Sequence, residues 1–423
     1  MKTCEKSLER HCLRYMEKLC EEIRERSVGS RGNRMAADFF EREISSLGWE
    51  TEKQEFEAMD WMDGGAELSV GENFFQVFPS PYSIGCDVEE ELVGISGVEE
   101  LEHADIGGKV VLLHGEIAGE QLMPRNFVFY NPEKHRRIIS LLDTGKPAAI
   151  ACATGRNASL AGGVYPFPLI EDGDFHIPSV YMTEEEGSRL LAFAGDTVKL
   201  SSRAERIPGG GFNVVARRGG PSAGRIVVTA HIDAKKGTPG AIDNASGVAV
   251  LLLMAGVLSE YGGPVQVEIV ALNGEDYYAA AGQMLYLRRN RDRFDNILMN
   301  INIDGAGYSE GPSAFSFYSL PKNMENIARA VMDEFDSITE GPPWPQGDHS
   351  IFIQNGCPAM AVSSLWFTDN IDSQEITHTT KDRIEIVDFG RLADIARALS
   401  LICERVSNEH SKRKEVDYES NGS

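Results

Sequence analysis

The chain has 423 residues, more than an ordinary single domain of about 100–200 residues, so we expect two domains. Hydrophobic residues make up 42% and charged residues 25%, proportions that allow a sizeable core and exclude wholesale disorder. The balance of 41 Lys and Arg against 65 Asp and Glu gives a net charge of -24. So acidic a surface repels phosphates and anionic lipids, and we therefore expect no nucleic-acid partner and no membrane partner.

The compartment is predicted from the first residues and from the cysteines. The N-terminal segment lacks the apolar core of a signal peptide, and no apolar run approaches the roughly 18–20 residues of a membrane span. Seven cysteines are an odd number, and none of them forms a CxxC pair. This pattern is typical of reduced thiols, so we expect a cytoplasmic protein.

The sequence pattern in the first half of the chain changes near residue 60. Before it, apolar residues recur with helical period over 5–26 and 34–47, and a strand is expected over 51–56. Between 60 and 207, Gly, Pro and short apolar strands dominate. Pro208-Gly-Gly-Gly-Phe212 is typical of a linker between domains.

After this segment, strands and helices alternate regularly. Strands are expected at 225–230, 265–272, 296–303, 314–318 and 359–363, and helices at 245–261, 278–290, 323–335 and 388–407. This alternation predicts an α/β fold, a doubly wound mixed sheet flanked by helices. Residues 409–423 are polar, and we expect a disordered tail.

Polar residues with metal-ligand chemistry follow three of the expected strands. In open α/β sheets, ligands bind outside the carboxyl ends of the strands. The candidates are His231 and Asp233 after the first strand, Glu275 and Asp276 after the second, Asp304 after the third, Asp243 before a helix, and His378 near the last helix. Taken singly, Asp243 could cap a helix and Asp304 could be a turn residue.

Taken together, these residues predict a metal site, because several accidents at equivalent strand ends would otherwise have to coincide. Buried like charges are also costly unless a cation compensates them. Imidazole and carboxylate ligands without thiolate suit zinc, with cobalt or manganese as substitutes. Two His and three acidic residues exceed one tetrahedral ion, and they fit two ions about 3.5–4 Å apart with one bridging carboxylate. A further carboxylate is then left as general base.

The motifs resemble those of family twenty-eight of the metallopeptidases, the co-catalytic zinc aminopeptidases that also include glutamate carboxypeptidases. They are Ala230-His-Ile-Asp233, Gly240-Ala-Ile-Asp-Asn-Ala-Ser-Gly247, Asn273-Gly-Glu-Asp276, Asn302-Ile-Asp304, Gly347-Asp-His-Ser-Ile-Phe352, and Thr377-His378 with Asp382. The resemblance implies that His231 and Asp304 bind one zinc ion and that Asp276 and His378 bind the other. It further implies that Asp243 bridges both ions, that Glu275 is the general base, and that Asp233 orients His231.

One position departs from the family pattern. The family commonly has two consecutive Glu where this chain has Glu275-Asp276. Asp is one methylene shorter, so a single ion remains the alternative to two. Asp348-His349 resembles a family motif near the site, for which we expect packing or pocket support. Trp344 and Trp366-Phe367 lie near the motifs, where they either line a pocket or pack.

Residues 60–207 resemble the protease-associated insertion found in some family members. Its cues include Ile106-Gly-Gly-Lys-Val-Val-Leu112 and Ile177-Pro-Ser-Val-Tyr181. The resemblance implies a lid or substrate-selecting domain, and a spacer is the alternative. The expected organisation is thus a discontinuous zinc peptidase domain at 1–59 and 208–408 with the insertion between.

The activity that the resemblance implies is metal-dependent hydrolysis of N-terminal peptide bonds. The expected partner is a peptide or small amide substrate, and the oligomeric state stays open. One alternative is a carboxypeptidase or an amidohydrolase that acts on a non-peptide amide. The other is a non-catalytic binding protein on a peptidase fold.

Overall fold

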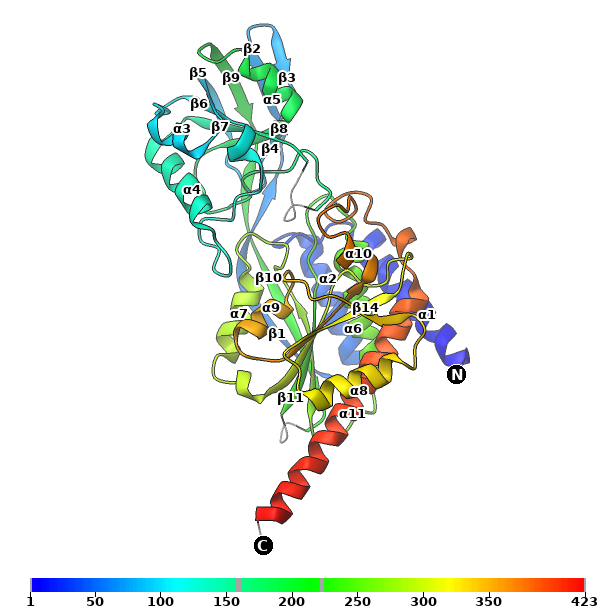
Figure 1. Ribbon diagram of the computed structural model, residues 1–423. Helices are drawn as coiled ribbons and strands as arrows, with labels where there is room; N and C mark the ends of the chain where they lie inside the picture. The colour runs from blue at the N-terminus through cyan, green and yellow to red at the C-terminus, as the bar shows by residue number, and fades with distance from the viewer. Residues whose placement is uncertain (1, 157–161, 221–223, 422–423) are drawn as a thin grey trace. The chain divides into compact units, whose positions relative to one another are not determined.

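The computed structural model describes residues 2–156, 162–220 and 224–421 (Figure 1). The chain divides into two compact units. The larger unit comprises Met1–Glu57, Gly210–Ile371 and Thr377–Ser423, and the smaller unit comprises Ala58–Gly209 and Asp372–Ile376. The short segment Asp372–Ile376 was not expected in the smaller unit, because the sequence analysis assigned all of 208–408 to one domain.

The larger unit begins with two helical segments and a strand. Helix α1 (Lys2–Glu17) continues into the π-helical turn η1 (Lys18–Glu22), and helix α2 spans Arg31–Ser46. Helix α2 begins earlier than expected because the Ser30 hydroxyl accepts a hydrogen bond from the backbone N–H of Asn33 at 3.0 Å. Strand β1 (Glu50–Met62) follows.

The sheet of the larger unit contains eight strands in the order β1-β10-β12-β11-β13-β16-β14-β15. These strands span β10 (Glu205–Arg218), β11 (Arg225–His231), β12 (Gln266–Leu272), β13 (Ile297–Ile303), β14 (Ser313–Tyr318), β15 (Ile338–Glu340) and β16 (Ala359–Ser364). The four central strands are parallel, whereas β10 is antiparallel to β12 and β14 to β16. The prediction of a mixed, doubly wound sheet is confirmed, and the carboxyl ends of the central strands meet at one edge.

Helices cover both faces of this sheet (Figure 1). Helix α6 (Ser246–Val257) packs on β11 and β12 and is itself covered by α1, α2 and α11 (Phe389–Asn421). The other helices of the unit are α7 (Ala281–Asn290), α8 (Lys322–Met332), α9 (His349–Gln354) and α10 (Leu365–Asp369). Helix α9 packs on β13 and β16. The central strands are accordingly buried along almost their whole length.

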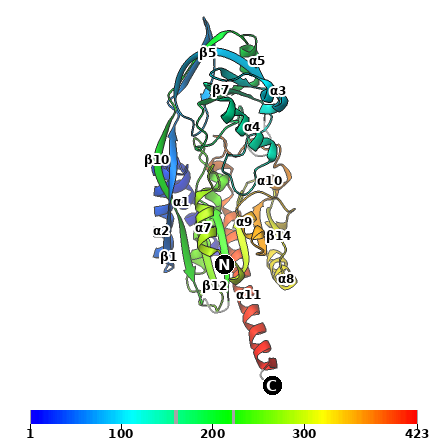
Figure 2. The same ribbon diagram turned by 90° about the vertical axis from the view of Figure 1, so that its left-hand side faces the viewer.

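Two segments have regular secondary structure where the sequence suggested a linker and a disordered tail. Residues 208–212 are not a linker loop, because they lie inside β10, whose pairing with β1 holds the glycines extended. The boundary between the two units falls within this strand, at Gly209 and Gly210. The tail from 409 continues α11 as a helix to Asn421, and Figures 1 and 2 both show its last turns extending beyond the rest of the unit. Glu, Lys and Arg are good helix formers, which accounts for the continuation.

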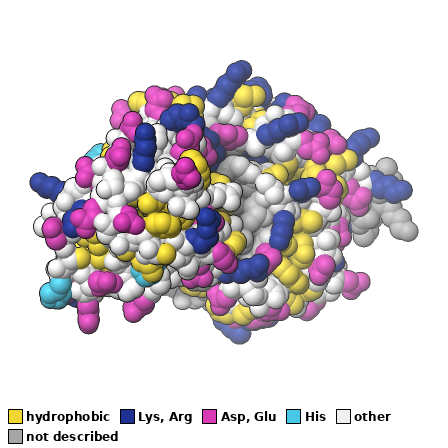
Figure 3. Space-filling view, turned by 90° about the horizontal axis from the view of Figure 1, so that it is seen from above, with side chains coloured by type: hydrophobic (Ala, Val, Ile, Leu, Met, Phe, Trp, Pro, Cys, Tyr) yellow, Lys and Arg dark blue, Asp and Glu magenta, His cyan; other side chains and the backbone are white. Residues whose placement is uncertain are grey.

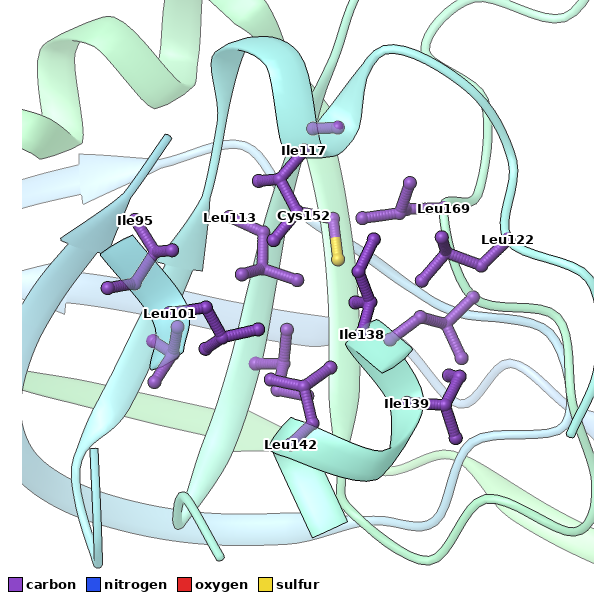
Figure 4. Close-up of a cluster of buried hydrophobic side chains, with 14 of the residues drawn as sticks. Ile95, Leu101, Leu113, Ile117, Leu122, Ile138, Ile139, Leu142, Cys152 and Leu169 are labelled. Carbon is purple, nitrogen blue, oxygen red and sulfur yellow. The ribbon is translucent and has the colours of Figure 1, made fainter. Parts of the chain in front are cut away.

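The smaller unit is built on a second eight-stranded sheet, in the order β3-β2-β9-β5-β6-β7-β8-β4. Its strands are β2 (Ala66–Val70), β3 (Asn73–Phe75), β4 (Phe78–Pro79), β5 (Cys86–Ile95), β6 (Val110–Leu113), β7 (Ala149–Thr154), β8 (Ser179–Thr183) and β9 (Thr197–Ser202). Its helices are α3 (Val98–His103), α4 (Glu133–Gly145) and α5 (Glu184–Leu191). Figure 4 shows Ile138, Ile139 and Leu142 of α4 in one buried cluster with Leu113 and Cys152 of the sheet. This unit therefore has a core of its own.

Charges of both signs are mixed on one face of the molecule. Figure 3 shows acidic side chains interspersed with basic ones across the face that it displays. Among the residues that the structure describes, no helix combines the length and apolar character needed to cross a membrane.

Candidate metal centre

The predicted ligands converge because the central strands are parallel and in register. His231 is the last residue of β11 and pairs with Leu272, so the segment from Asn273 to Asp276 begins beside it. On the other side, Thr229 pairs with Asn302, which places Asp304 just beyond the same edge.

Asp243 lies between the two predicted histidine ligands. Its Oδ1 is 3.1 Å from Nε2 of His231, and its Oδ2 is 3.2 Å from Nε2 of His378. Nε2 of His231 is also 3.6 Å from Oδ1 of Asp304, and Nε2 of His378 is 3.1 Å from Oδ1 of Asp276. Two groups of three potential ligands result, and Asp243 belongs to both.

Glu275 belongs to a third group, with His231 and Asp276. The ligand atoms of this group lie within 4.8 Å of one another. Glu275 is only partly buried, whereas Asp276 beside it is buried. All seven residues predicted for the site are therefore brought together at one edge of the sheet.

Asp233 connects two strand ends. Its Oδ1 lies 3.7 Å from Nδ1 of His231. Its carboxylate also accepts hydrogen bonds from the backbone N–H groups of Gly274, at 2.7 Å, and Asp276, at 3.0 Å. Asp233 thus fixes the turn that carries Glu275 and Asp276, a role that the sequence did not predict.

Asp382 holds the backbone of Asp243 in the same way. Its two oxygens accept hydrogen bonds from the N–H groups of Ile242, at 2.7 Å, and Asp243, at 3.0 Å. Burial and the nearby charge of Asp243 raise the pKa of Asp382 to about 7. The two N–H donors and the charge of Arg26 lower this pKa but do not outweigh the increase. Asp382 is thus fully enclosed beside the centre.

Arg26 is a buried residue that sequence reasoning missed as part of the site. Its guanidinium donates hydrogen bonds to the carbonyls of Leu19 at 2.7 Å, Ile232 at 3.2 Å, and Pro239 and Gly240, each at 2.8 Å. These bonds tie the N-terminal segment to the loop between His231 and Asp243. No local signal marks Arg26, because it stands at the end of a predicted amphipathic helix where a solvated Arg is expected.

Asn33 and Asn273 form a second missed connection. Each side-chain amide donates to the other's carbonyl oxygen at 2.9 Å, and Asn273 lies two residues before Glu275. The Asn33 amide also donates to the carbonyl of Arg26 at 2.9 Å. The N-terminal segment therefore supports two of the loops that carry the ligands.

The aromatic residues near the motifs divide into two sets. Gly347 lies against the first, since a Cβ there would stand 3.0 Å from Cζ3 of Trp344 and 3.3 Å from Oδ2 of Asp304. Trp344 therefore lies close to the centre. The second set, Trp366 and Phe367, packs against Tyr308, with ring centroids 4.8 and 5.2 Å away.

Asp348 and His349 are both buried but differ in partners. Asp348 accepts a hydrogen bond from Nε2 of Gln283 at 2.5 Å, and burial raises its pKa to about 7. His349 packs between the rings of Tyr318 and Trp344, and its Nε2 donates to the carbonyl of Trp344 at 3.0 Å. Burial lowers the pKa of His349 to about 4, so the ring is neutral at pH 7.

The ligands perturb one another electrostatically. Burial lowers the pKa of both histidines, but the carboxylates outweigh it and raise them well above the ordinary value, chiefly Asp304 at His231 and Asp276 at His378. Burial raises the pKa of Asp243, but the two histidines, whose Nε2 atoms each lie near one of its oxygens, outweigh it and hold this pKa below its usual range. The arrangement thus favours the charged form of the Asp243 carboxylate.

Glu275 differs from Asp243 in this respect. Burial raises its pKa well above the ordinary value, and the carboxylates of Asp276, Asp304 and Asp348 add to this effect against the charge of His231. A carboxyl group with a raised pKa is suited to receiving a proton near neutral pH.

The residues present fit a metal ion. Oδ2 of Asp276 and Nε2 of His231 are buried and have no hydrogen-bond partner among the described residues. Buried polar atoms are usually satisfied, and several carboxylates at one point repel each other without a cation. Imidazole and carboxylate donors suit zinc.

Comparison with known proteins agrees with this geometry. Residues 213–402 match the model of a family described as peptidase family M28. A probable leucine aminopeptidase 2 from Aspergillus oryzae is 23% identical over 356 residues, covering 79% of this chain and 68% of that protein. Aminopeptidase YwaD from Bacillus subtilis is 23% identical over 258 residues, covering 59% of this chain and 56% of that protein.

Solved structures show the same fold. BSAP, a zinc aminopeptidase from Bacillus subtilis, superposes with a TM-score of 0.70 at 19% identity, covering 94% of both chains. An aminopeptidase from Aneurinibacillus sp. strain AM-1 gives a TM-score of 0.70 at 19% identity, covering 93% of this chain and 92% of that one. Over residues 213–402, the chain is therefore similar to peptidase family M28.

Proposed function

We propose that the protein is a zinc-dependent aminopeptidase that hydrolyses N-terminal peptide bonds. The family match and the aminopeptidase names of the similar proteins support this activity. The larger unit would be the peptidase domain, and residues 60–207 would be its inserted domain.

The observation that carries the proposal is the position of Asp243, with one carboxylate oxygen near each histidine. This position supports two zinc ions with Asp243 as the shared ligand. His231 and Asp304 would complete one ion, and Asp276 and His378 the other. The shorter Asp276 supports this assignment as well, because its Oδ1 reaches within 3.1 Å of Nε2 of His378.

Bound zinc would supply a water nucleophile of lowered pKa and would polarise the scissile carbonyl. The residues of this chain have separate tasks around that chemistry. Glu275 would receive the proton of the nucleophile on its carboxylate and return it to the leaving amine. Asp233 would hold the turn that aims Glu275 and would keep His231 oriented. Trp344, close to Asp304, would contribute to a wall beside the substrate.

A substrate panel tests the activity. The purified protein, loaded with zinc or cobalt, is assayed on aminoacyl arylamides, on the same arylamides with a blocked amine, and on C-terminally free peptides. Metal content is measured in parallel. We expect two ions per chain and cleavage only where the N-terminal amine is free. Cleavage restricted to blocked substrates would instead identify another amidohydrolase, and a chain that binds no metal would leave only a binding protein.

A further inference from the structure

The loop before His378 belongs to the smaller unit, although the rest of the chain around it belongs to the larger one. Asp372–Ile376 groups with Ala58–Gly209, and the chain returns to the larger unit at Thr377. His378 follows one residue later. The smaller unit is thus connected by only two peptide bonds to a predicted metal ligand.

Within the smaller unit, Glu375 of this loop contacts Arg156 and Gly163. Nη1 of Arg156 is 2.5 Å from Oε1 of Glu375. Gly163 lies directly against the backbone of the loop, because a Cβ at Gly163 would come to 2.5 Å from the carbonyl carbon of Glu375. Real Cβ atoms do not approach backbone so closely, so any larger residue at Gly163 must displace the loop.

His378 needs support because its backbone is strained. Its φ is 62°, in the left-handed region that residues other than Gly rarely adopt. Such a conformation persists only where the surrounding structure determines it. On the C-terminal side, the carbonyl of Thr379 accepts a hydrogen bond from the Thr238 hydroxyl at 2.9 Å, and Asp382 is held by two backbone N–H groups. On the N-terminal side, Glu375 lies three residues away and contacts Arg156 and Gly163 of the smaller unit.

We propose that the smaller unit positions the metal ligand His378, with Gly163 and Arg156 acting as positioning residues through Glu375. This inference rests on the proposed function, since it takes His378 as a ligand. It assigns the insertion a task distinct from that of a lid or a spacer. Binding of one zinc ion then depends on a contact made outside the peptidase sheet.

The test uses Gly163→Ala in the full chain. The metal-free protein is titrated with Zn²⁺ by calorimetry and with Co²⁺ by its visible absorption, and hydrogen exchange is followed at residues 376–379. We expect one of the two sites to weaken by at least about tenfold, as for loss of support behind a ligand, with the other unchanged. Exchange at 376–379 should become faster. Circular dichroism and thermal unfolding establish that the variant is folded.

The matched control is Gly97→Ala, in the same unit, because a Cβ at Gly97 has nothing within 4 Å. It should bind both ions as the wild type does. A second series does not depend on steric insertion: Arg156→Glu and Glu375→Arg should each weaken the same site up to about fivefold, and the double exchange should restore it.

Two outcomes overturn the inference, and they differ from failure of the proposed function. A folded Gly163→Ala protein that binds both ions with wild-type affinity refutes the positioning role alone. Equal weakening of both sites refutes it too, since His378 would then not be selectively affected. A wild-type protein that binds no metal refutes the proposed function, and the inference with it.

Discussion

Asp382 accepts a hydrogen bond from the backbone N–H of Asp243 at 3.0 Å, so one buried carboxylate fixes the backbone of another. The charges of the two side chains repel each other, as the raised pKa of Asp382 records. The arrangement nevertheless requires a carboxylate at position 382. Both of its oxygens can accept, so together they satisfy the backbone N–H groups of Ile242 and Asp243.

Asp382→Asn therefore should weaken metal binding although it removes a negative charge. The amide has one acceptor and one donor end, so one backbone N–H would face another donor. We expect about 10–100-fold lower zinc affinity, measured by competition with a chelator. Glu385→Gln, an exposed position three residues away, should have no effect. Tighter zinc binding by Asp382→Asn would show that charge, rather than hydrogen bonding, dominates.

Glu275→Gln should abolish turnover while leaving metal content intact. A general base contributes about 10²–10⁴-fold to the rate, and Gln cannot take up the proton. Steady-state kinetics on an aminoacyl arylamide, with metal analysis of the same sample, measures both quantities. Full activity in this variant would eliminate Glu275 as the base.

Removal of metal should destabilise the protein. Without a cation, the clustered carboxylates repel each other in a site largely shielded from water. Ligand linkage gives about 2.7 kcal/mol of stabilisation when free zinc is at 100 times its dissociation constant. Thermal unfolding of chelator-treated protein, followed during addition of zinc, should show a transition temperature that rises with zinc concentration. A transition that ignores zinc would argue against the centre.

His349 should make stability depend on pH. Its folded pKa is about 4, below the ordinary 6.5, because burial disfavours the charged ring. Between pH 4 and 6.5, His349 binds a proton more tightly in the unfolded chain than in the folded protein. The free energy of unfolding is therefore highest above about pH 6.5 and decreases as the pH falls towards 4. The loss amounts to about 3 kcal/mol.

His349→Phe separates this contribution from the others. The phenyl ring keeps the packing on Tyr318 and Trp344, and the carbonyl of Trp344 retains the hydroxyl of Tyr318 as a donor at 2.6 Å. Denaturant unfolding at pH 4 and at pH 7 measures the difference in the free energy of unfolding between these two pH values. This difference should be about 3 kcal/mol smaller in the variant than in the wild type. Identical pH dependence in the two proteins would mean that His349 is charged in the folded state.

Arg26→Lys should destabilise the protein more than its conservative chemistry suggests. An ammonium group has three donors and cannot serve four carbonyls that face a planar guanidinium. A buried unsatisfied carbonyl costs about 1–3 kcal/mol. Denaturant unfolding measures the loss, and Arg24→Lys on the exposed face provides the comparison. Equal stability of the two variants would contradict a stabilising role for the hydrogen bonds of Arg26.

The fold and most of the site were predictable because their signals are local. An apolar run that ends in His231 indicates a buried strand followed by a ligand within a few residues. The parallel register of the neighbouring strands then places their carboxyl ends, and the ligands that follow them, side by side. Arg26 and the pair of Asn33 with Asn273 were not predictable, since their partners lie some 200 residues away. Gly163 is similar, because its contact at Glu375 depends on how the chain returns to the smaller unit.

The packing of α1 and α2 on α6, and of α1 on α11, also sets the order in which this chain can fold during synthesis. Helices α1 and α2 leave the ribosome before the 152 residues of Ala58–Gly209, and α11 leaves it after the strands of the sheet. Domains generally fold as units as they emerge. The inserted unit has its own core and can form early, except for its segment Asp372–Ile376, while α1 and α2 wait exposed for the sheet. The apolar faces of α1 and α2 therefore stay exposed on the nascent chain until α6 has been made and can cover them.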